Sequence, residues 1–207
     1  MLIKICGITR SRDAQSAMAC GADFCGFIFH PKSPRAVDPA WVAGVDTGNM
    51  RRVGVFVEED ADTICAIMQA ARLDYAQLHG AQSEDCARRI GPERVIRVLW
   101  PERYHHKAQL YAAMQTYATS CAYYLFDAGT AGGGHGQCLE WGDFAGLEGP
   151  HPWFLAGGLH PGNVLEAALE SHAAGLDINS GVESAPGRKD ERKIRAAISM
   201  VRAHYAE

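Results

Sequence analysis

The chain has 207 residues, of which 47% are hydrophobic and 21% are charged, and its formal net charge is −4. These values are typical of a globular protein and lack the basic footprint of nucleic-acid-binding domains. No apolar run approaches the roughly 18 residues of a membrane span, and the opening residues, with a charge at Lys4, do not resemble a signal peptide. We therefore expect a cytoplasmic protein that binds neither nucleic acid nor membrane.

Short apolar runs typical of β-strands recur along the whole chain. In order, they are residues 2–6, 23–29, 52–57, 74–79, 94–100, 122–127, 152–157 and 175–179. Helix-compatible segments separate them, at about 12–20, from Pro39 onward, and at about 60–72, 83–90, 103–119, 140–147, 161–171 and 189–204. Pro39 is a good first-turn residue, and Asp38 before it is a candidate helix cap.

Strands that alternate with helices predict a parallel sheet. Eight such units predict an α/β fold in which a single domain, residues 1–207, forms a closed (β/α)₈ TIM barrel. A doubly wound open sheet is the competing fold. The barrel is preferred because a final helix follows the eighth strand and no strand is left unpaired.

Glycine-rich segments follow the seventh and eighth predicted strands. Gly157, Gly158, Ser180 and Gly181 lie there, and the loops after these two strands are the recurrent phosphate site of the barrel fold. Glycine lets backbone N–H groups approach an anion closely. We therefore expect a phosphate site, with simple tight turns as the alternative.

Two groups at strand ends are candidates for proton transfer, Cys6 and Asp127. Side chains alternate along a strand, so Lys4 and Cys6 are expected to point into the barrel together. Lys4 would lower the pKa of the Cys6 thiol unless it pairs with Asp177, whose predicted strand neighbours the first strand in a closed barrel. The alternatives are a core cysteine at position 6 and a loop cap at position 127.

Arg35 lies in a loop between predicted strand and helix, beside Pro31 and Pro34. An arginine can grip a carboxylate with two parallel hydrogen bonds, and Lys32 adds charge nearby. Most surface arginines are solvated cations, which is the alternative here.

The cysteines and histidines give no metal signal. The seven cysteines, an odd number, are scattered without a Cys-x-x-Cys pair, so reduced thiols are expected. His105 and His106 are adjacent in a predicted helix and have no ligand partner one turn later, so they are interpreted as surface residues.

Motifs along nearly the whole chain resemble the phosphoribosylanthranilate isomerase family. They are KICGIT (4–9), GFIF with SPR (26–35), QLHG (77–80), FDAG with the glycines after it and Trp141, LAGGL (155–159) with Asn163, and GLDINSGVESAPGRKD (175–190). The family catalyses an Amadori rearrangement of phosphoribosylanthranilate, a phosphosugar derivative, in tryptophan biosynthesis, without a metal or organic cofactor. Members are either separate chains or fused to the next pathway enzyme.

The resemblance implies a role for each candidate residue. Cys6 matches the general base, Asp127 the general acid, and Arg35 the residue that binds the anthranilate carboxylate. The phosphate site matches the residues Gly157, Gly158, Ser180 and Gly181. The oligomeric state is left open between monomer and homodimer.

The chain departs from the family pattern at two places. Asn179 precedes Ser180 where a serine pair is expected, and His135 stands in the loop where threonine is expected. One alternative function is the related histidine-pathway isomerase, whose first strand carries an aspartate where this chain has Cys6. A dual-substrate enzyme is expected to carry that aspartate as well. The other alternative is a non-catalytic phosphate-ligand binding barrel, which could lose the acid or the base.

Overall fold

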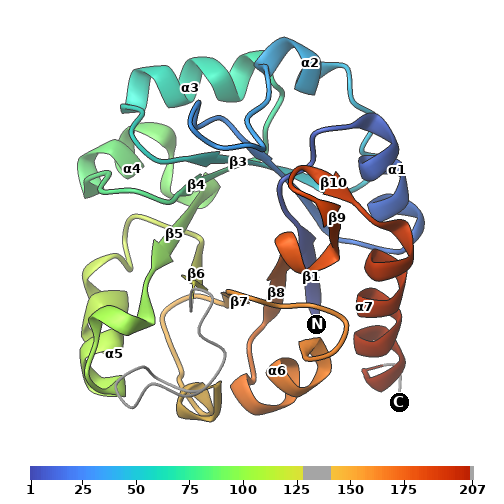
Figure 1. Cartoon of the computed structure of the whole chain (residues 1–207). Coiled ribbons are helices and arrows are strands. Elements are labelled where there is room, and N and C mark those ends of the chain that lie inside the picture. The colour runs from blue at the N-terminus through green and yellow to red at the C-terminus, as the bar shows by residue number, and fades with distance from the viewer. Residues whose placement is uncertain (128–140, 206–207) are drawn as a thin grey trace.

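The structure is a computed structural model that describes residues 1–127 and 141–205. Eight parallel strands form a closed barrel in chain order (Figure 1). They are β1 (Leu2–Ile5), β2 (Phe24–Ile28), β3 (Arg51–Phe56), β4 (Tyr75–Leu78), β5 (Val95–Leu99), β6 (Tyr123–Asp127), β7 (Trp153–Ala156) and β8 (Gly175–Ile178). The open-sheet alternative is wrong, because β8 pairs with β1 and closes the ring, with Lys4 opposite Asp177. The predicted (β/α)₈ barrel is confirmed.

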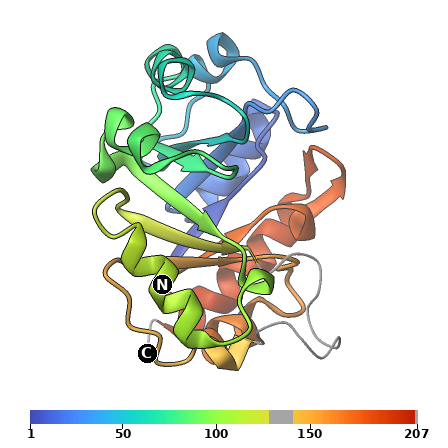
Figure 2. The ribbon, with the colours of Figure 1, turned by 90° about the vertical axis from the view of Figure 1, so that its left-hand side faces the viewer.

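The helices lie outside the ring of strands, as Figures 1 and 2 show. They are α1 (Ser11–Ala19), α2 (Pro39–Ala43), α3 (Ala61–Ala70), α4 (Glu84–Ile90), α5 (Lys107–Thr116), α6 (Val164–Ser171) and α7 (Glu191–His204). Short 3₁₀ turns add η1 (Pro92–Arg94), η2 (Pro101–Arg103), η3 (Trp141–Phe144) and η4 (Ser180–Val182). A small antiparallel hairpin, β9 (Glu183–Ala185) with β10 (Arg188–Lys189), follows β8.

Strand alternation divides the core into two layers. Outward-facing side chains such as Ile3 and Ile5 belong to the large cluster between barrel and helices. The barrel interior holds a second cluster, which consists of Phe24, Val53, Ile96, Val98, Leu125, Phe154 and Ala156. This parity places Lys4 and Cys6 inside the barrel, as the sequence predicts.

Several helices begin at a polar residue whose side chain accepts backbone hydrogen bonds. The predicted cap Asp38 accepts from Ala40 N at 2.8 Å and from Trp41 N at 3.3 Å. Asp60 and Asp190 cap α3 and α7 in the same way. Each cap of this type stabilises its helix by about 1 kcal/mol.

Some predicted helices are shorter than expected. The segment 103–119 contains α5 only over Lys107–Thr116, because Pro101 opens a 3₁₀ turn that ends at Arg103. His105 and His106 therefore precede the helix, although both are exposed as predicted. Where the sequence predicts a helix at about 140–147, the described residues 141–147 contain a 3₁₀ turn, Trp141–Phe144, in place of an α-helix.

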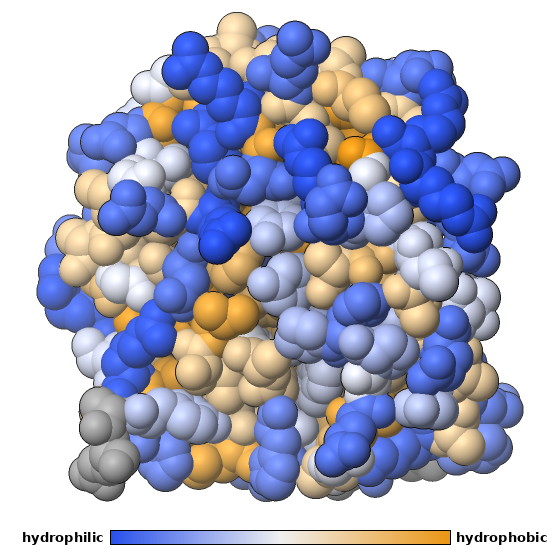
Figure 3. All heavy atoms as spheres, turned by 180° about the vertical axis from the view of Figure 1, so that it is seen from behind, coloured by the Kyte–Doolittle hydropathy of each residue, from blue (hydrophilic) through white to orange (hydrophobic). Residues whose placement is uncertain are grey.

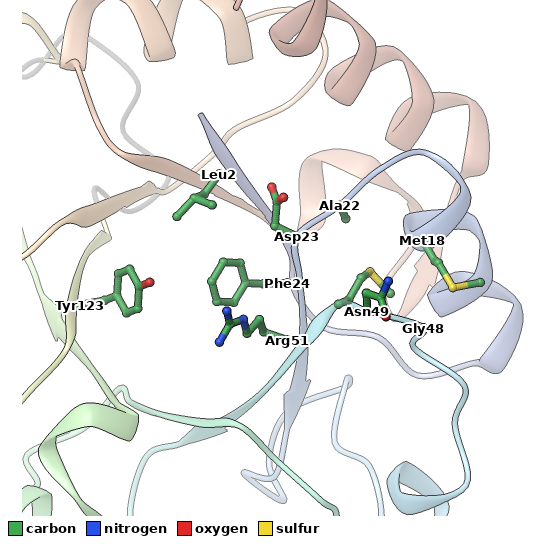
Figure 4. A pocket seen from close by; sticks show the side chains of 10 residues that line it. Leu2, Met18, Ala22, Asp23, Phe24, Gly48, Asn49, Arg51 and Tyr123 are labelled. Carbon is green, nitrogen blue, oxygen red and sulfur yellow. The ribbon is translucent and has the colours of Figure 1, made fainter.

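The N-terminal ends of the strands are closed by aromatic rings. Phe24 packs against Phe154 with ring centroids 5.3 Å apart, and Tyr75 packs against Tyr123 at 5.7 Å. Beside them lies a cavity of about 530 Å³ (Figure 4), into which the rings of Phe24 and Tyr123 extend. Its carboxylate, Asp23, accepts hydrogen bonds from Ile3 N and from Arg202, so its charge is satisfied within the fold.

The face opposite to the view of Figure 1 is covered by hydrophilic side chains with hydrophobic atoms between them in small groups (Figure 3). Scattered apolar groups of this kind are normal on a protein surface. Within the described ranges, none of the helices combines the length and apolar character needed to cross a membrane.

Candidate active site

A cavity of about 410 Å³ opens at the C-terminal ends of the strands, where barrel enzymes place their chemistry. Its polar and glycine lining comes from β4, β6 and β8 and from the segments that follow β1, β2, β4, β7 and β8. These residues are Cys6, His30, Ser33, Gln77, His79, Asp127, Gly157, Gly158, Asp177, Asn179 and Ser180. Both proton-transfer candidates and three of the four phosphate-site candidates therefore surround one space.

Cys6 follows β1 and is almost fully buried at the cavity wall. Gly26 on the neighbouring strand makes room for it, because a Cβ there would lie 2.7 Å from Cys6 Sγ and 3.1 Å from Lys4 Nζ. Burial raises the pKa of Cys6, and the nearby Lys4 ammonium only partly opposes this increase. The raised pKa therefore favours the thiol form of Cys6.

Lys4 is fully buried and donates to both carboxylate oxygens of Asp177, each at 2.9 Å. The pairing considered from the sequence is thus present. Asp177 raises the pKa of Cys6 while Lys4 lowers it, so the pair limits the net effect of the cation.

Asp127 is the last residue of β6, and its side chain is 26% exposed. Its Oδ2 lies 3.5 Å from Nε2 of His79. Burial lowers the pKa of His79, and the charge of Asp127 opposes this decrease. A neutral imidazole beside the carboxyl group can exchange a proton with it or orient it.

His79 and Gln77 are site residues that the sequence reasoning did not single out. Nε2 of Gln77 lies 3.2 Å from Nδ1 of His79, and the Trp100 ring packs edge-on against the imidazole at 5.7 Å. Both residues stand in the QLHG motif at the end of β4. Their place at a strand end, together with Asp127, was the signal that could have identified them.

The phosphate-site candidates differ in what their backbone does. Gly157 and Gly158 have φ angles of +101° and +63°, which favour glycine, and both line the cavity. Asn163 Nδ2 holds this turn through a hydrogen bond to Gly158 O. Gly181 lies behind the wall, where a Cβ would lie 1.9 Å from Leu159 O, so it permits close contact between the loops after β7 and β8.

Arg35 is not part of the cavity lining. Its Nε and Nη2 donate to the two carboxylate oxygens of Glu183 at 2.8 and 2.7 Å. It lies beside the cavity wall all the same, because a Cβ on Gly7 would lie 2.8 Å from Arg35 Cδ and 2.6 Å from Oδ1 of Asn179, which lines the cavity. The structure therefore places Arg35 at the edge of the site, already paired with a carboxylate of the chain.

The remaining sequence candidates concern metals and the loop after β6. His135 and the glycines of that loop lie outside the described residues. Among the residues that the structure describes, no three His, Cys, Asp or Glu side chains are grouped closely enough to hold a metal ion.

Comparison with known proteins matches residues 3–200 to the family model described as N-(5′-phosphoribosyl)anthranilate isomerase. A relative of that name from Desulfovibrio desulfuricans is 55% identical over 200 residues, covering 97% of this chain and 95% of the relative. Its counterpart from Maridesulfovibrio salexigens is 44% identical, with coverages of 97% and 98%.

Solved structures agree with the sequence relatives. The phosphoribosylanthranilate isomerase of Thermotoga maritima superimposes with a TM-score of 0.85 at 30% identity, covering 98% of this chain and 99% of the other. A related structure, in complex with reduced 1-(o-carboxyphenylamino)-1-deoxyribulose 5-phosphate, gives a TM-score of 0.83 at 29% identity, with coverages of 98% and 100%.

Proposed function

The chain belongs to the N-(5′-phosphoribosyl)anthranilate isomerase family, and we propose that it catalyses the Amadori rearrangement of this family in tryptophan biosynthesis. The substrate, N-(5-phosphoribosyl)anthranilate, becomes 1-(o-carboxyphenylamino)-1-deoxyribulose 5-phosphate. One observation carries the proposal: Cys6 and Asp127 line the same cavity as Gly157, Gly158 and Ser180. A phosphate site, an acid and a base thus surround one volume of substrate size.

In the proposed mechanism Asp127 is the general acid. It gives a proton to the furanose ring oxygen, the ring C–O bond breaks, and the nitrogen lone pair forms an iminium. His79, 3.5 Å from Asp127, is placed to orient the carboxyl group. A positioned acid of this kind contributes about 10²- to 10⁴-fold.

Cys6 is the general base in the same mechanism. Its thiolate removes the proton from C2′ of the iminium, and the enolamine that forms tautomerises to the ketone. Because burial raises the pKa of Cys6, the small thiolate fraction is strongly basic. The Lys4 ammonium supplies the nearby positive charge that this thiolate requires.

Substrate binding is assigned to residues at the opening of the active-site cavity, called the mouth below. Gly157, Gly158 and Ser180 bind the 5′-phosphate through N–H and hydroxyl donors, and Gly181 holds the two loops together. Arg35 binds the anthranilate carboxylate at the cavity edge, with the guanidinium N–H groups that Glu183 leaves free. No metal or organic cofactor takes part in the proposed steps.

The setting of the enzyme is part of the proposal. We propose one domain over residues 1–207, located in the cytoplasm, as a monomer or a homodimer. A Thermotoga maritima relative is described as dimeric. The partner of the site is a small phosphosugar, not a nucleic acid or a membrane.

The decisive experiment follows the fluorescence of phosphoribosylanthranilate, which an anthranilate phosphoribosyltransferase generates in place. The purified protein should remove the substrate fluorescence even when a chelator is present, because no metal takes part in the proposed steps. Cys6→Ala and Asp127→Asn should each lower turnover by about 10²- to 10⁴-fold while keeping the circular dichroism of the parent. Near-normal turnover in either variant removes that residue from the mechanism. A folded parent that leaves the fluorescence unchanged contradicts the function, and the histidine-pathway substrate is then tested.

A further inference from the structure

Two buried charges lie behind the wall of the active-site cavity and have no part in the proposed proton transfers. Glu183, on β9, is 8% exposed, and Lys189, on β10, is 5% exposed. They pair with each other at 2.9 Å. Burying two ions is costly unless other groups complete their hydrogen bonds, so the partners of this pair show what it does.

The Lys189 ammonium group binds Asn179, the residue at which this chain departs from the family pattern. Nζ donates to Asn179 O at 3.0 Å, to Asn179 Oδ1 at 2.9 Å and to Glu183 Oε1 at 2.9 Å. An ammonium has three donors and no acceptor, so these contacts use all of its capacity. The atom of the Asn179 amide that faces Lys189 must therefore be the oxygen.

This contact fixes the orientation of an amide that otherwise has two nearly equivalent orientations. With Oδ1 held by Lys189, both N–H donors of Nδ2 are left for another acceptor. Asn179 lines the active-site cavity. A serine at this position offers only one donor, on a hydroxyl group that rotates.

Glu183 fixes the orientation of the Arg35 guanidinium group. Its carboxylate takes the Nε and Nη2 side of the Arg35 guanidinium in a two-point contact. Burial raises the pKa of Glu183, but hydrogen bonds from Arg35 and Lys189 outweigh it, so the pKa falls below its usual value and the group stays ionised. The end of the guanidinium that carries Nη1 and the second Nη2 hydrogen remains for another carboxylate.

The Asn179 amide and the Arg35 side chain both approach Gly7, the residue that follows Cys6. A Cβ on Gly7 would lie 2.6 Å from Asn179 Oδ1 and 2.8 Å from Arg35 Cδ, and Gly7 has a φ of +72°. Asn179 and Arg35 therefore both lie close to the backbone that carries Cys6, on the side of Gly7 to which a Cβ would point.

We propose that the buried Lys189–Glu183 pair is a positioning pair, which aims the Asn179 amide donors and the free end of the Arg35 guanidinium at the anionic substrate. The proposal rests on the proposed function, since it assigns these donors to that substrate. Lys189 and Glu183 touch no reacting atom and act through Asn179 and Arg35.

The test compares KM with kcat in Glu183→Gln and in Arg35→Ala, alone and combined. Because the pair aims groups that bind substrate in the ground state, Glu183→Gln should raise KM by about tenfold or more while kcat changes less than threefold. The KM effects of the two single variants should not add in the double variant, because Glu183 acts through Arg35. Additive effects, or an unchanged KM, overturn the positioning role.

A second variant covers the case in which Glu183→Gln does not fold. Asn179→Asp keeps an oxygen for Lys189 and removes the Nδ2 donors, so it should raise KM by about tenfold without lowering the melting temperature. An unchanged KM in Asn179→Asp contradicts the assignment of the amide donors.

The matched control is Glu191→Gln on α7, an exposed residue that pairs with Arg195 at 2.8 Å. It removes a carboxylate from an exposed arginine that does not line the active-site cavity, and it should leave both constants unchanged. The parent chain separates the two proposals: an active parent with unchanged variants overturns only the positioning pair, whereas an inactive parent overturns both.

Discussion

The two ends of the barrel are made by the same strands and have opposite physical character. At the C-terminal end, buried ions meet around a cavity, with Lys4 paired to Asp177 and Lys189 paired to Glu183. At the N-terminal end, Phe24 and its aromatic neighbours fill the interior with rings. Ions in low dielectric are expensive to bury, whereas rings contribute apolar area and specific edge contacts.

The difference shows how the fold separates stability from chemistry. The N-terminal cavity, at about 530 Å³, is larger than the active-site cavity at about 410 Å³. Size therefore does not identify the site. The active-site cavity contains the Cys6 thiol and the Asp127 carboxyl group 3.5 Å from the His79 imidazole, while Asp23 at the other end pairs with Arg202 at 2.6 Å.

The largest expected effect tests whether the N-terminal end of the barrel contributes only to stability, and it comes from removing one aromatic ring there. Phe24→Ala should lower the free energy of unfolding by about 3–5 kcal/mol, because Phe24 is 3% exposed and packs against three other rings. The turnover per folded molecule should stay at the parent value. Chemical denaturation and the fluorescence assay measure the two quantities on the same sample.

Loss of turnover in folded Phe24→Ala would show that the two ends are coupled. If that variant does not fold, Phe24→Leu, with an expected cost of about 1 kcal/mol, gives the same comparison.

An effect of intermediate size is expected from two glycine substitutions, one at the active-site end of the barrel and one outside the site. Gly181→Ala places a Cβ 1.9 Å from Leu159 O at the mouth, whereas Gly21→Ala meets nothing within 4 Å but has a φ of +87°. Gly181→Ala should raise KM, since the loops after β7 and β8 must move apart. Gly21→Ala should cost about 1–2 kcal/mol of stability from backbone strain and leave KM unchanged. Equal KM values in both variants would contradict the role of Gly181.

The smallest effect concerns the reactivity of thiols. Burial raises the pKa of Cys6, and it raises that of Cys25 to about 12, while Cys65 is exposed. At pH 8, iodoacetamide should therefore alkylate Cys65 before Cys6 and Cys25, with Cys6 at least about tenfold slower than Cys65. The rate at Cys6 should increase as the pH rises, because a raised pKa keeps the proton on until higher pH. Mass spectrometry of peptides after timed alkylation measures each site, and a Cys6 as fast as Cys65 would show that Lys4 outweighs burial.

The parts that the sequence predicted correctly are those that depend on local pattern. Strand alternation placed Lys4 inside the barrel, and closure of the ring then required Asp177 beside it. Gly157 and Gly158 follow a predicted strand, and they adopt the positive φ angles that the sequence analysis associates with glycine, whereas their binding of phosphate stays a prediction.

The parts that were missed depend on contacts between distant segments. Arg35 and Glu183 are 148 residues apart, and nothing local to either indicates that they pair. His79 lies beside Asp127 only because β4 and β6 both end at the mouth. Helix lengths were overestimated where Pro101 starts a tight turn before α5.

Gly26 has a consequence for how the sequence is able to vary. A methyl group at this position would lie 2.7 Å from Cys6 Sγ and 3.1 Å from Lys4 Nζ, so the strand beside the base has no room for a side chain. A saturation library at position 26 should therefore return glycine in its active clones, because a smaller residue at position 6 would make room only by removing the proposed base. Glycine at position 26 and cysteine at position 6 are thus expected to persist together in a selection experiment that starts from this chain.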